Sequence, residues 1–457
     1  MASIFMETIN TIVHLRGDET GAELGEEMRR LAAAAEKYFA LPVVWEDFDL
    51  SLGKRTETKN GIVTESADRV REIGIGVKDA TISLEPDDRR PGMRGSPNAI
   101  LRKRIQDEHT LGTIILREAK PLPGVPPRIP GSGYETFGTS VVREGAGGFY
   151  NAAVSYEDPR RGVRGEPRRN DLEQIVHTDE PVPRGQHRVA AMYAFRLAHE
   201  TGAVVVGGPK FTIHDGDGSL QREIRRARDV FSGKPVVALT GEGIRYVEDT
   251  NDTIEAYRHE IAEERRRLNL PGEGISERAL AAYNEWLIDA LYAWLVDKGP
   301  GTLREGDGAD IVIPTTNRDG DCVSDLVAPI YSSVAGMTSE IMAVNKTYEP
   351  TAVIAEAAHG TAPRSFRLNR ANPLAMFLAL SIAYKRLGEM HARRETESEV
   401  AKNYRRASEG VRRACMAVIG DGQMTQDLAR RMQQGGRAVK KVLKMGEFTE
   451  EVAQHMV

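Results

Sequence analysis

The first part of the chain alternates short apolar runs with amphipathic segments. Apolar runs at 11–15, 42–50 and 75–84 are separated by stretches at 21–40 and 64–74 whose apolar residues recur with helical spacing. Runs rich in Ile and Val that alternate with amphipathic helices are typical of sequential strand-helix units. The pattern therefore predicts an α/β fold for this part of the chain.

Pro and Gly interrupt this pattern between residues 118 and 148, which predicts turns and irregular connections where the chain leaves its first domain. Residues 156–185 are polar and rich in arginine, so they form either a solvated loop or an arm that contacts a second copy. Helices and strands resume from 186 to 331. After 332 the pattern predicts one last strand, PTAVIAEAAHG, followed by helices to the end.

Length and composition limit the protein class. A chain of 457 residues exceeds the usual size of a single core, so we expect two domains. The 62 basic and 67 acidic residues give a net charge of −5, which does not suggest a nucleic-acid or membrane-surface partner. The two cysteines are far apart, and we find no signal peptide and no apolar run that could span a bilayer. We expect a cytoplasmic protein.

The stretch NRDGDCVSD, residues 317–325, gathers three aspartates directly after an apolar run. If the chain becomes helical after Gly320, Asp321 and Asp325 project from one face of the helix. Two carboxylates on one face suit Mg²⁺ or Mn²⁺, although acidic residues at such a turn are more often helix caps. Taken alone, the stretch leaves both interpretations open.

Residues 95–105, GSPNAILRKRI, indicate the start of a helix with Ser96 as N-cap and Pro97 in the first turn. Asn98 and Arg102 share one face of this helix, and Arg117 ends a strand-like run nearby. A helix N-terminus and arginine forks both favour carboxylates, so this group would suit a polycarboxylic acid. An ordinary capped helix with surface arginines is the alternative.

The stretch AEAAHGTAPRSFRLNRANP, residues 355–373, forms a loop after the last predicted strand, where open α/β sheets bind ligands. No GxGxxG follows a strand, and the chain contains no GxxxxGK[ST], HExxH or GxSxG. A Rossmann or P-loop nucleotide site is therefore not supported.

Taken in order, these stretches resemble the β-decarboxylating dehydrogenases of the isocitrate/isopropylmalate family, and among them the NADP-dependent enzymes that act on isocitrate. Each match is weak alone, but the ordered set spans most of the chain and is specific. The matching stretches are RGDET, GVKDATIS, SPNAILR, IILRE, VREGAGGFY, PKFTI, EWLID, NRDGDCVSD, AEAAHGTAPR, ANP and DGQMTQDLA.

The resemblance implies the fold and the domain plan. A large α/β domain without a Rossmann motif would comprise residues 1–117 and 332–457. A smaller α/β domain at 118–331 would carry the dimer helices and a clasp at about 150–195 that joins two copies. The family builds its active site across this dimer interface, so the resemblance implies a homodimer.

The resemblance also assigns the residues that act on the substrate. Its catalytic residues would be Tyr150 and Lys210, with Lys210 supplied to the partner's site. The substrate carboxylates would be held by Ser83, Ser96, Asn98, Arg102, Arg117, Arg143 and Thr212. The divalent metal would be bound by Asp321 and Asp325 of one chain and by Asp289 of the other.

The resemblance places NADP on two loops. The nicotinamide side would contact Lys78, Ala80 and Thr81, and the adenosine side would contact His359, Gly360, Thr361, Ala362, Arg364 and Asn372. Arg364 stands where the NADP enzymes of the family place a basic residue against the 2′-phosphate. Ser365 departs from the histidine or tyrosine that is common at the next position.

The implied activity is metal-dependent oxidative decarboxylation of isocitrate to 2-oxoglutarate and CO₂ with reduction of NADP. Three departures bear on the substrate: the longer spacing between Arg102 and Arg117, the loss of polar residues between Arg143 and Tyr150, and an insertion at 232–275. Homoisocitrate or a phosphonate analogue of isocitrate is therefore an alternative substrate. A catalytically silent regulatory paralogue is less favoured, because the predicted catalytic and metal-binding residues are all present.

Overall fold

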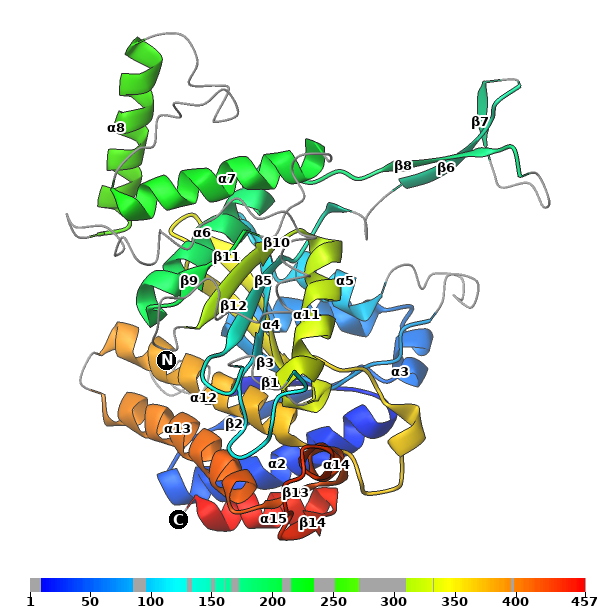
Figure 1. Cartoon of the computed structure of the whole chain (residues 1–457), viewed down its shortest axis with the longest axis vertical. Helices are drawn as coiled ribbons and strands as arrows, with labels where there is room; N and C mark the ends of the chain where they lie inside the picture. Colours follow the sequence, from blue (N-terminus) through cyan, green and yellow to red (C-terminus); the bar gives the residue numbers. More distant parts are fainter. Residues whose placement is uncertain are drawn as a thin grey trace.

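The computed structural model describes residues 10–84, 96–129, 134–148, 153–160, 162–165, 172–207, 215–233, 251–270, 310–331, 333–395 and 398–456. These residues form one body built on a central sheet, with helices on both sides and a thin arm that projects from it (Figure 1). The predicted α/β character is confirmed for this part of the chain.

A nine-stranded sheet forms the centre of the molecule. Four strands at one end are parallel, three antiparallel pairings follow between β12 and β5, and the other end is parallel again. In spatial order the strands are β2 (Val44–Asp49), β1 (Thr11–Arg16), β3 (Ile75–Lys78), β12 (Pro350–Ala357), β11 (Thr338–Asn345), β4 (Thr110–Ala119), β5 (Thr139–Glu144), β10 (Ile311–Thr315) and β9 (Val204–Val205).

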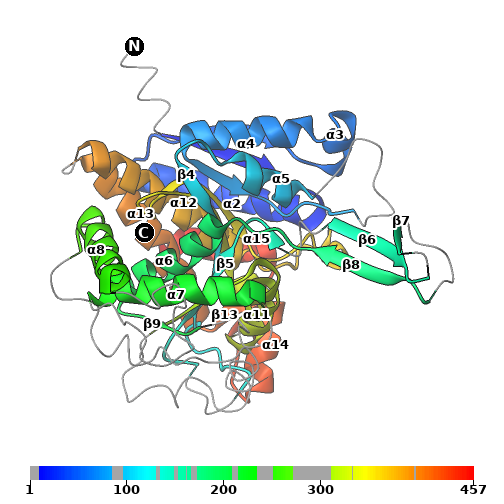
Figure 2. The same cartoon turned by 90° about the horizontal axis from the view of Figure 1, so that it is seen from above.

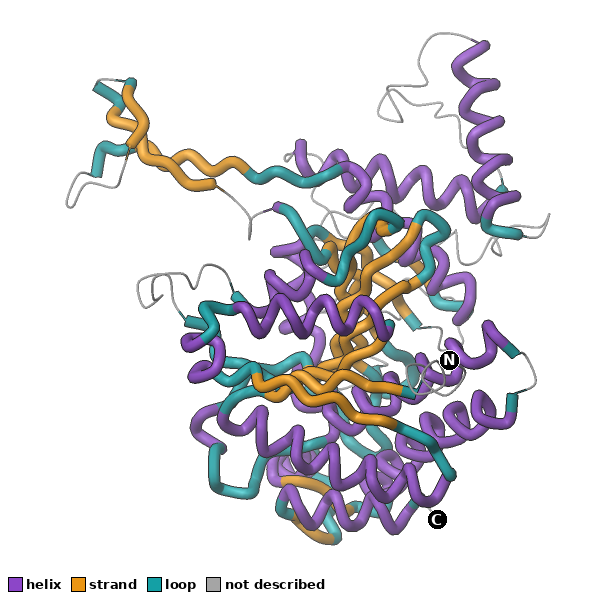
Figure 3. The backbone as a smooth tube through the Cα atoms, turned by 180° about the vertical axis from the view of Figure 1, so that it is seen from behind, coloured by secondary structure: helices purple, strands orange, loops and turns teal. Residues whose placement is uncertain are grey.

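Two groups of helices lie on opposite sides of the first half of the sheet (Figure 3). Their apolar faces bury a core against the strands, which is the main favourable contribution to folding. One group comprises α2 (Glu19–Phe39), α12 (Leu374–Arg394), α13 (Glu399–Gly420) and α15 (Met445–His455). The other comprises α3 (Leu52–Glu57), α4 (Gly61–Ile73) and α5 (Pro97–Arg104).

The second half of the sheet lies between α6 (Arg184–Thr201) and α11 (Asn317–Tyr331). A separate cluster of buried residues, including Tyr134, Val141 and Val327, fills the space under α11. Outside α6 lie α7 (Asp215–Ser232) and α8 (Asn251–Arg267), and α8 stands away from the body (Figure 1).

Three short strands form the projecting arm: β6 (Ala153–Asp158), β7 (Val163–Gly165) and β8 (Ile175–Asp179). Figure 2 shows the arm extending sideways, with its strands making no sheet with the body. A smaller parallel pair, β13 (Gln423–Thr425) and β14 (Lys441–Leu443), lies with α14 (Gln426–Gln434) near the C-terminus. Single turns of 3₁₀ helix occur at η5 (Val334–Gly336) and η6 (Pro363–Ser365).

Two sequence predictions were wrong. Residues 118–148 are not entirely irregular, because 139–144 form the fully buried strand β5. The chain after 332 contains β11, β13 and β14 besides the predicted strand. Polar residues interrupt the apolar pattern of β11. Glu340 is buried there because Arg386 of α12 neutralises it at 2.9 Å, and only the tertiary structure supplies this pairing.

The predicted helix start at Ser96 is confirmed. Ser96 precedes α5 with extended backbone, and its hydroxyl accepts a hydrogen bond from the backbone N–H of Ala99 at 3.2 Å. The helical interpretation of the aspartate stretch is also confirmed, with the difference that α11 begins at Asn317, before Gly320.

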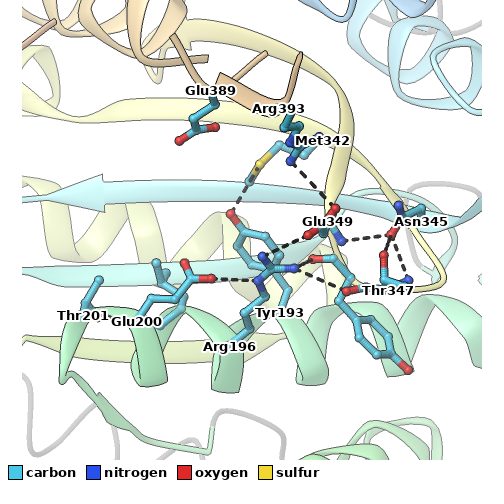
Figure 4. A network of polar contacts seen from close by, with 12 residues as sticks. Tyr193, Arg196, Glu200, Thr201, Met342, Asn345, Thr347, Glu349, Glu389 and Arg393 are labelled. Atoms are coloured by element: carbon cyan, nitrogen blue, oxygen red, sulfur yellow. Dashed lines mark hydrogen bonds and ion pairs between the residues drawn. The ribbon is translucent and has the colours of Figure 1, made fainter. Parts of the chain in front are cut away.

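Polar contacts join α6 to α12 across the turn between β11 and β12 (Figure 4). Arg196 of α6 donates to the carbonyl of Thr347 at 3.3 Å and pairs with Glu349 at 3.5 Å. Glu349 also lies 3.8 Å from Arg393 of α12. This turn therefore links helices that cover the two halves of the sheet. No described helix has the length and apolar content needed to cross a membrane.

A buried histidine connects β1 to β2 and to the loop after β3. His14 is 3% exposed, and its ring nitrogens contact Asp47 at 3.2 Å and Asp79 at 3.0 Å. Burial alone would lower the pKa of His14, but Asp79 and Asp47 together raise it to about 9. The imidazolium is therefore the form present at neutral pH.

This raised pKa predicts a pH dependence of stability. Because the folded-state pKa of His14 exceeds its ordinary value of 6.5, its contribution is complete below pH 6.5 and disappears as the pH rises through about 9. The wild-type chain should be more stable than His14→Gln by on the order of 2 kcal/mol at pH 6, a value that allows for the half-exposed Asp47. Chemical unfolding of both proteins from pH 6 to 9.5 measures the difference in their free energies of unfolding. A difference that does not decrease as the pH rises would contradict the prediction.

Candidate active site

Four polar side chains stand in register across four neighbouring strands. Lys78 of β3 pairs with Glu356 of β12, Glu356 with Ser339 of β11, and Ser339 with Arg117 of β4. Residues directly opposite one another in a sheet project to the same face. The register therefore brings the predicted cofactor residue Lys78 and the predicted substrate residue Arg117 onto one face of the sheet.

Glu356 is the centre of this polar row. Its carboxylate accepts from Lys78 Nζ at 3.0 Å and from the Ser339 hydroxyl at 3.1 Å, and Lys78 also donates to the carbonyl of Asp79 at 3.1 Å. Burial would raise the pKa of Glu356, but Lys78, followed by Arg102 and Arg117, lowers it overall. The sequence reasoning missed Glu356 and Ser339, although a glutamate inside the apolar run TAVIAEAA was a usable signal.

The two predicted substrate arginines meet the acidic side chains of α11. Arg117 Nη1 lies 3.0 Å from Asp321 and 3.1 Å from Asp325, and it donates to the Ser324 hydroxyl at 2.8 Å. Arg143, which is 2% exposed, donates to Asp321 as well. Buried guanidinium groups require counter-charges, so α11 neutralises both arginines.

Gly320 makes this approach possible. A Cβ atom at Gly320 would lie 2.7 Å from the Arg143 side chain and 2.3 Å from the Thr315 hydroxyl. Real Cβ atoms do not approach other atoms so closely, so a side chain here would displace Arg143. The glycine in NRDGD therefore allows the arginine to cross the first turn of α11.

The two aspartates fit a hard divalent cation. Asp321 Oδ1 and Asp325 Oδ1 both lie within hydrogen-bond distance of one nitrogen, Arg117 Nη1, so the two oxygens converge on a common point. Carboxylate oxygens are the ligands that Mg²⁺ and Mn²⁺ prefer. Burial raises the pKa of Asp325, against the lowering effect of Arg117. Within the described ranges no three or more His, Cys, Asp or Glu residues are placed to hold a metal, and the third predicted ligand, Asp289, lies outside them.

Asp319 differs from the other two aspartates. Its carboxylate pairs with Arg318 at 3.1 Å. Asp319 lies in the first turn of α11.

The helix α5 borders this group through its C-terminal half. Gln106, just past the helix, donates to the carbonyl of Arg102 at 3.1 Å and to the Thr113 hydroxyl of β4 at 3.0 Å. The Asn98 side-chain oxygen is buried and accepts no hydrogen bond from the part of the chain that the structure describes. A buried amide oxygen without a donor is costly, so it is available to a bound ligand.

The stretch between Arg102 and Arg117 contains an exposed turn between α5 and β4. There Asp107 accepts hydrogen bonds from His109 and Thr110, and both Glu108 and His109 are exposed. This turn lies at the start of β4, whereas Arg117 lies near its end.

Two loops that the sequence predicts to bind the cofactor meet at the start of α2. The backbone N–H of Asp18 donates to the carbonyl of Ala80 at 2.9 Å, and the Thr20 hydroxyl donates to the carbonyl of Ala362 at 3.0 Å. The loop after β1 thus holds the nicotinamide-side loop beside the 359–364 loop. Thr81 is half-buried in this arrangement, and Ser83 is exposed.

The predicted adenosine-side residues lie along the loop after β12. His359 is close to the carbonyl of Gly360 at 2.9 Å, and burial lowers its pKa, which favours the neutral imidazole. Asn372 donates to Asp427 at 3.1 Å and accepts from the backbone of Leu374 at 3.0 Å. Arg364 is exposed, and half-buried Thr361 precedes it. Asp427 was missed by the sequence reasoning.

Four predicted site residues lie outside the described residues: Tyr150, Lys210, Thr212 and Asp289. Their roles, like those of the other predicted site residues, stay predictions.

Comparison with known proteins shows the family of this chain. The model of the isocitrate/isopropylmalate dehydrogenase family matches residues 11–452. The mitochondrial NADP isocitrate dehydrogenase of Aspergillus niger is 27% identical over 441 residues, covering 92% of this chain and 74% of the relative. The NADP isocitrate dehydrogenase of Sphingobium yanoikuyae is 27% identical over 443 residues, covering 92% of this chain and 91% of the relative.

Solved structures confirm the predicted fold class. Isocitrate dehydrogenase from Ostreococcus tauri, in complex with isocitrate and magnesium, superposes with a TM-score of 0.65 at 19% identity over 98% of both chains. The enzyme from Methylococcus capsulatus gives a TM-score of 0.62 at 18% identity, covering 98% of this chain and 99% of that one. The resemblance identified in the sequence is confirmed, and the chain belongs to the isocitrate/isopropylmalate dehydrogenase family.

Proposed function

We propose that the protein catalyses the metal-dependent oxidative decarboxylation of isocitrate to 2-oxoglutarate and CO₂ with reduction of NADP. The observation that carries this proposal is the contact of Arg117 and Arg143 with the paired carboxylates Asp321 and Asp325. Such a group can bind an acid and a cation together, because the arginines suit carboxylates and the aspartates suit Mg²⁺ or Mn²⁺. Membership in the family and the names of the relatives support the same reaction.

Different residues of the chain would bind the substrate, transfer protons and hold the metal. Arg117, Arg143 and Asn98 would hold the substrate carboxylates, with Ser83, Ser96, Arg102 and Thr212 as the other predicted contacts. Lys210 from the partner would accept the hydroxyl proton, and Tyr150 would protonate the carbon that has lost CO₂. A divalent cation held by Asp321, Asp325 and the partner's Asp289 would supply Lewis acidity that lowers the pKa of the substrate hydroxyl.

NADP would lie on the two loops held together by the start of α2. Lys78, Ala80 and Thr81 would face the nicotinamide, and His359 to Ala362 with Asn372 would face the adenosine. The exposed Arg364 would pair with the 2′-phosphate. Arg370 donates to the backbone carbonyl of Arg364 at 2.5 Å, so a second guanidinium on this loop would add positive charge for the 2′-phosphate.

A homodimer would complete the site, and the arm supports this part of the proposal. Val154 pairs with Thr178 and Tyr156 with Val176, so these residues share one face of the arm, where Val154 and Val176 are 54% and 57% exposed. The other face carries the contact of His177 with Glu157 at 2.6 Å. Ile175, on the same face as Glu157, is 47% exposed, so apolar side chains are exposed on both faces of the arm, which suits the clasp that the family uses. A cytoplasmic location is proposed from the composition and the two free cysteines.

The reaction itself is tested by following NADPH absorbance with purified protein and Mg²⁺. Isocitrate should be turned over with a kcat/KM at least about tenfold above those for homoisocitrate, isopropylmalate and a phosphonate analogue of isocitrate. Turnover of another acid in preference to isocitrate would reassign the substrate. Absence of turnover with all four, in folded and dimeric protein, would refute the enzyme and favour the silent paralogue.

Arg364 is tested by a cofactor comparison. Arg364→Asp removes a guanidinium and places negative charge against the 2′-phosphate, so it should lower kcat/KM for NADP at least about tenfold while changing that for NAD much less. Arg367→Asp on the same loop is the control, since Arg367 lies over Phe366. An unchanged NADP-to-NAD ratio in Arg364→Asp would rule out the assigned role.

The metal ligands are tested by comparing three aspartates of one stretch. Asp321→Asn and Asp325→Asn should each weaken Mn²⁺ binding at least about tenfold, because each removes an anionic oxygen ligand. Asp319→Asn should bind Mn²⁺ like the wild type, since Asp319 pairs with Arg318. Electron paramagnetic resonance titration of free Mn²⁺ measures all three. An equal loss of Mn²⁺ affinity in all three variants would indicate a general effect of negative charge and would contradict a defined metal site.

A further inference from the structure

The segment between Arg143 and the predicted catalytic Tyr150 is almost without side chains. It reads Glu144, Gly145, Ala146, Gly147 and Gly148 before the described part ends. Gly147 and Gly148 have φ values of +82° and +67°, a region that residues with a Cβ atom rarely adopt. The one polar side chain of this segment, Glu144, is paired with His187 of α6, so residues 145–148 have no polar side chain of their own.

Asn317, the first residue of α11, contacts both ends of this segment. Its side-chain oxygen accepts from Arg143 Nε at 3.1 Å and from Arg143 Nη2 at 2.9 Å. Its side-chain nitrogen donates to the carbonyl of Gly147 at 3.1 Å. Asn317 is 3% exposed, so these bonds are shielded from competing water.

Backbone hydrogen bonds and the neighbouring residues Pro181 and Val182 also contact this loop. The backbone N–H of Gly145 donates to the carbonyl of Thr113 at 2.8 Å, and that of Gly148 donates to Pro181 at 3.1 Å. A cavity of about 240 Å³ lies against the loop, lined by Gly148, Glu180, His187 and Asn317 among others. On the cavity side, Asn317 contacts the loop through its hydrogen bond to the carbonyl of Gly147.

We propose that Asn317 is a positioning residue that fixes the loop leading to Tyr150 to the guanidinium of Arg143. The inference rests on the proposed function, because Tyr150 and Arg143 act on substrate only if that function holds. One amide performs both tasks, since its oxygen orients the arginine and its nitrogen sets the position of Gly147. Through Asn317, the position of Arg143 would thus fix the position of Gly147, three residues before Tyr150.

Two substitutions separate the tasks. Asn317→Asp keeps the oxygen that accepts from Arg143 but removes the donor to Gly147, whereas Asn317→Leu removes both. Asn10→Leu is the matched control, because Asn10 is also buried and accepts from His391 at 2.9 Å and from Tyr404 at 3.0 Å, on α12 and α13.

The tether is first tested without any reliance on activity. Hydrogen exchange followed by mass spectrometry should show faster exchange of the Gly145 and Gly148 amides in both Asn317 variants than in the wild type, by about tenfold or more. Asn10→Leu should leave this peptide unchanged. Unchanged exchange in Asn317→Asp, with the fold confirmed by circular dichroism, would overturn the tether whether or not the protein turns over isocitrate.

Steady-state kinetics then test the positioning role. Asn317→Asp should lower kcat by about ten- to 100-fold with KM for isocitrate within about threefold, because the arginine is retained while the loop is released. Asn317→Leu should also raise KM. A kcat unchanged in both variants, or a KM raised equally in both, would overturn the positioning role. A wild type that turns over no acid would refute the proposed function, while the exchange result still decides the tether.

Discussion

The site depends on the need of two arginines for negative charge. Arg143 of β5 is buried and Arg117 of β4 is 11% exposed, and an arginine withdrawn from water is stable only beside an anion. The first turns of α11 supply that anion. The position of α11, the glycine at 320 and the asparagine at 317 all follow from this pairing.

The same charges suit a site that must bind an acid and a cation together. Asp321 and Asp325 share one nitrogen of Arg117, and Asp321 also accepts from Arg143, so the two arginines and the two aspartates form one network of charges. An incoming carboxylate can replace an aspartate at the arginine, and an incoming cation can replace the arginine at the aspartates. On the same face of the sheet, Glu356 pairs with Lys78 and neutralises its positive charge.

Much of the local structure could be predicted. The helix at Ser96, the helix that carries Asp321 and Asp325, and the alternating first half of the chain followed from capping and periodicity. Strands β5 and β11 were missed because glycine and proline surround the first and buried polar residues interrupt the second. Asn317, Ser339 and Glu356 were missed because their partners lie far away in the sequence.

The sequence by itself determined the fold class, the family and the identity of the candidate ligands, because ordered motifs and apolar periodicity are local properties of the chain. Only the tertiary structure decided which of these residues meet. Strand register placed Lys78, Glu356 and Arg117 on one face, and helix packing placed Asn317 between Arg143 and Gly147. Register and packing depend on the burial of distant segments against one another, which no local pattern encodes.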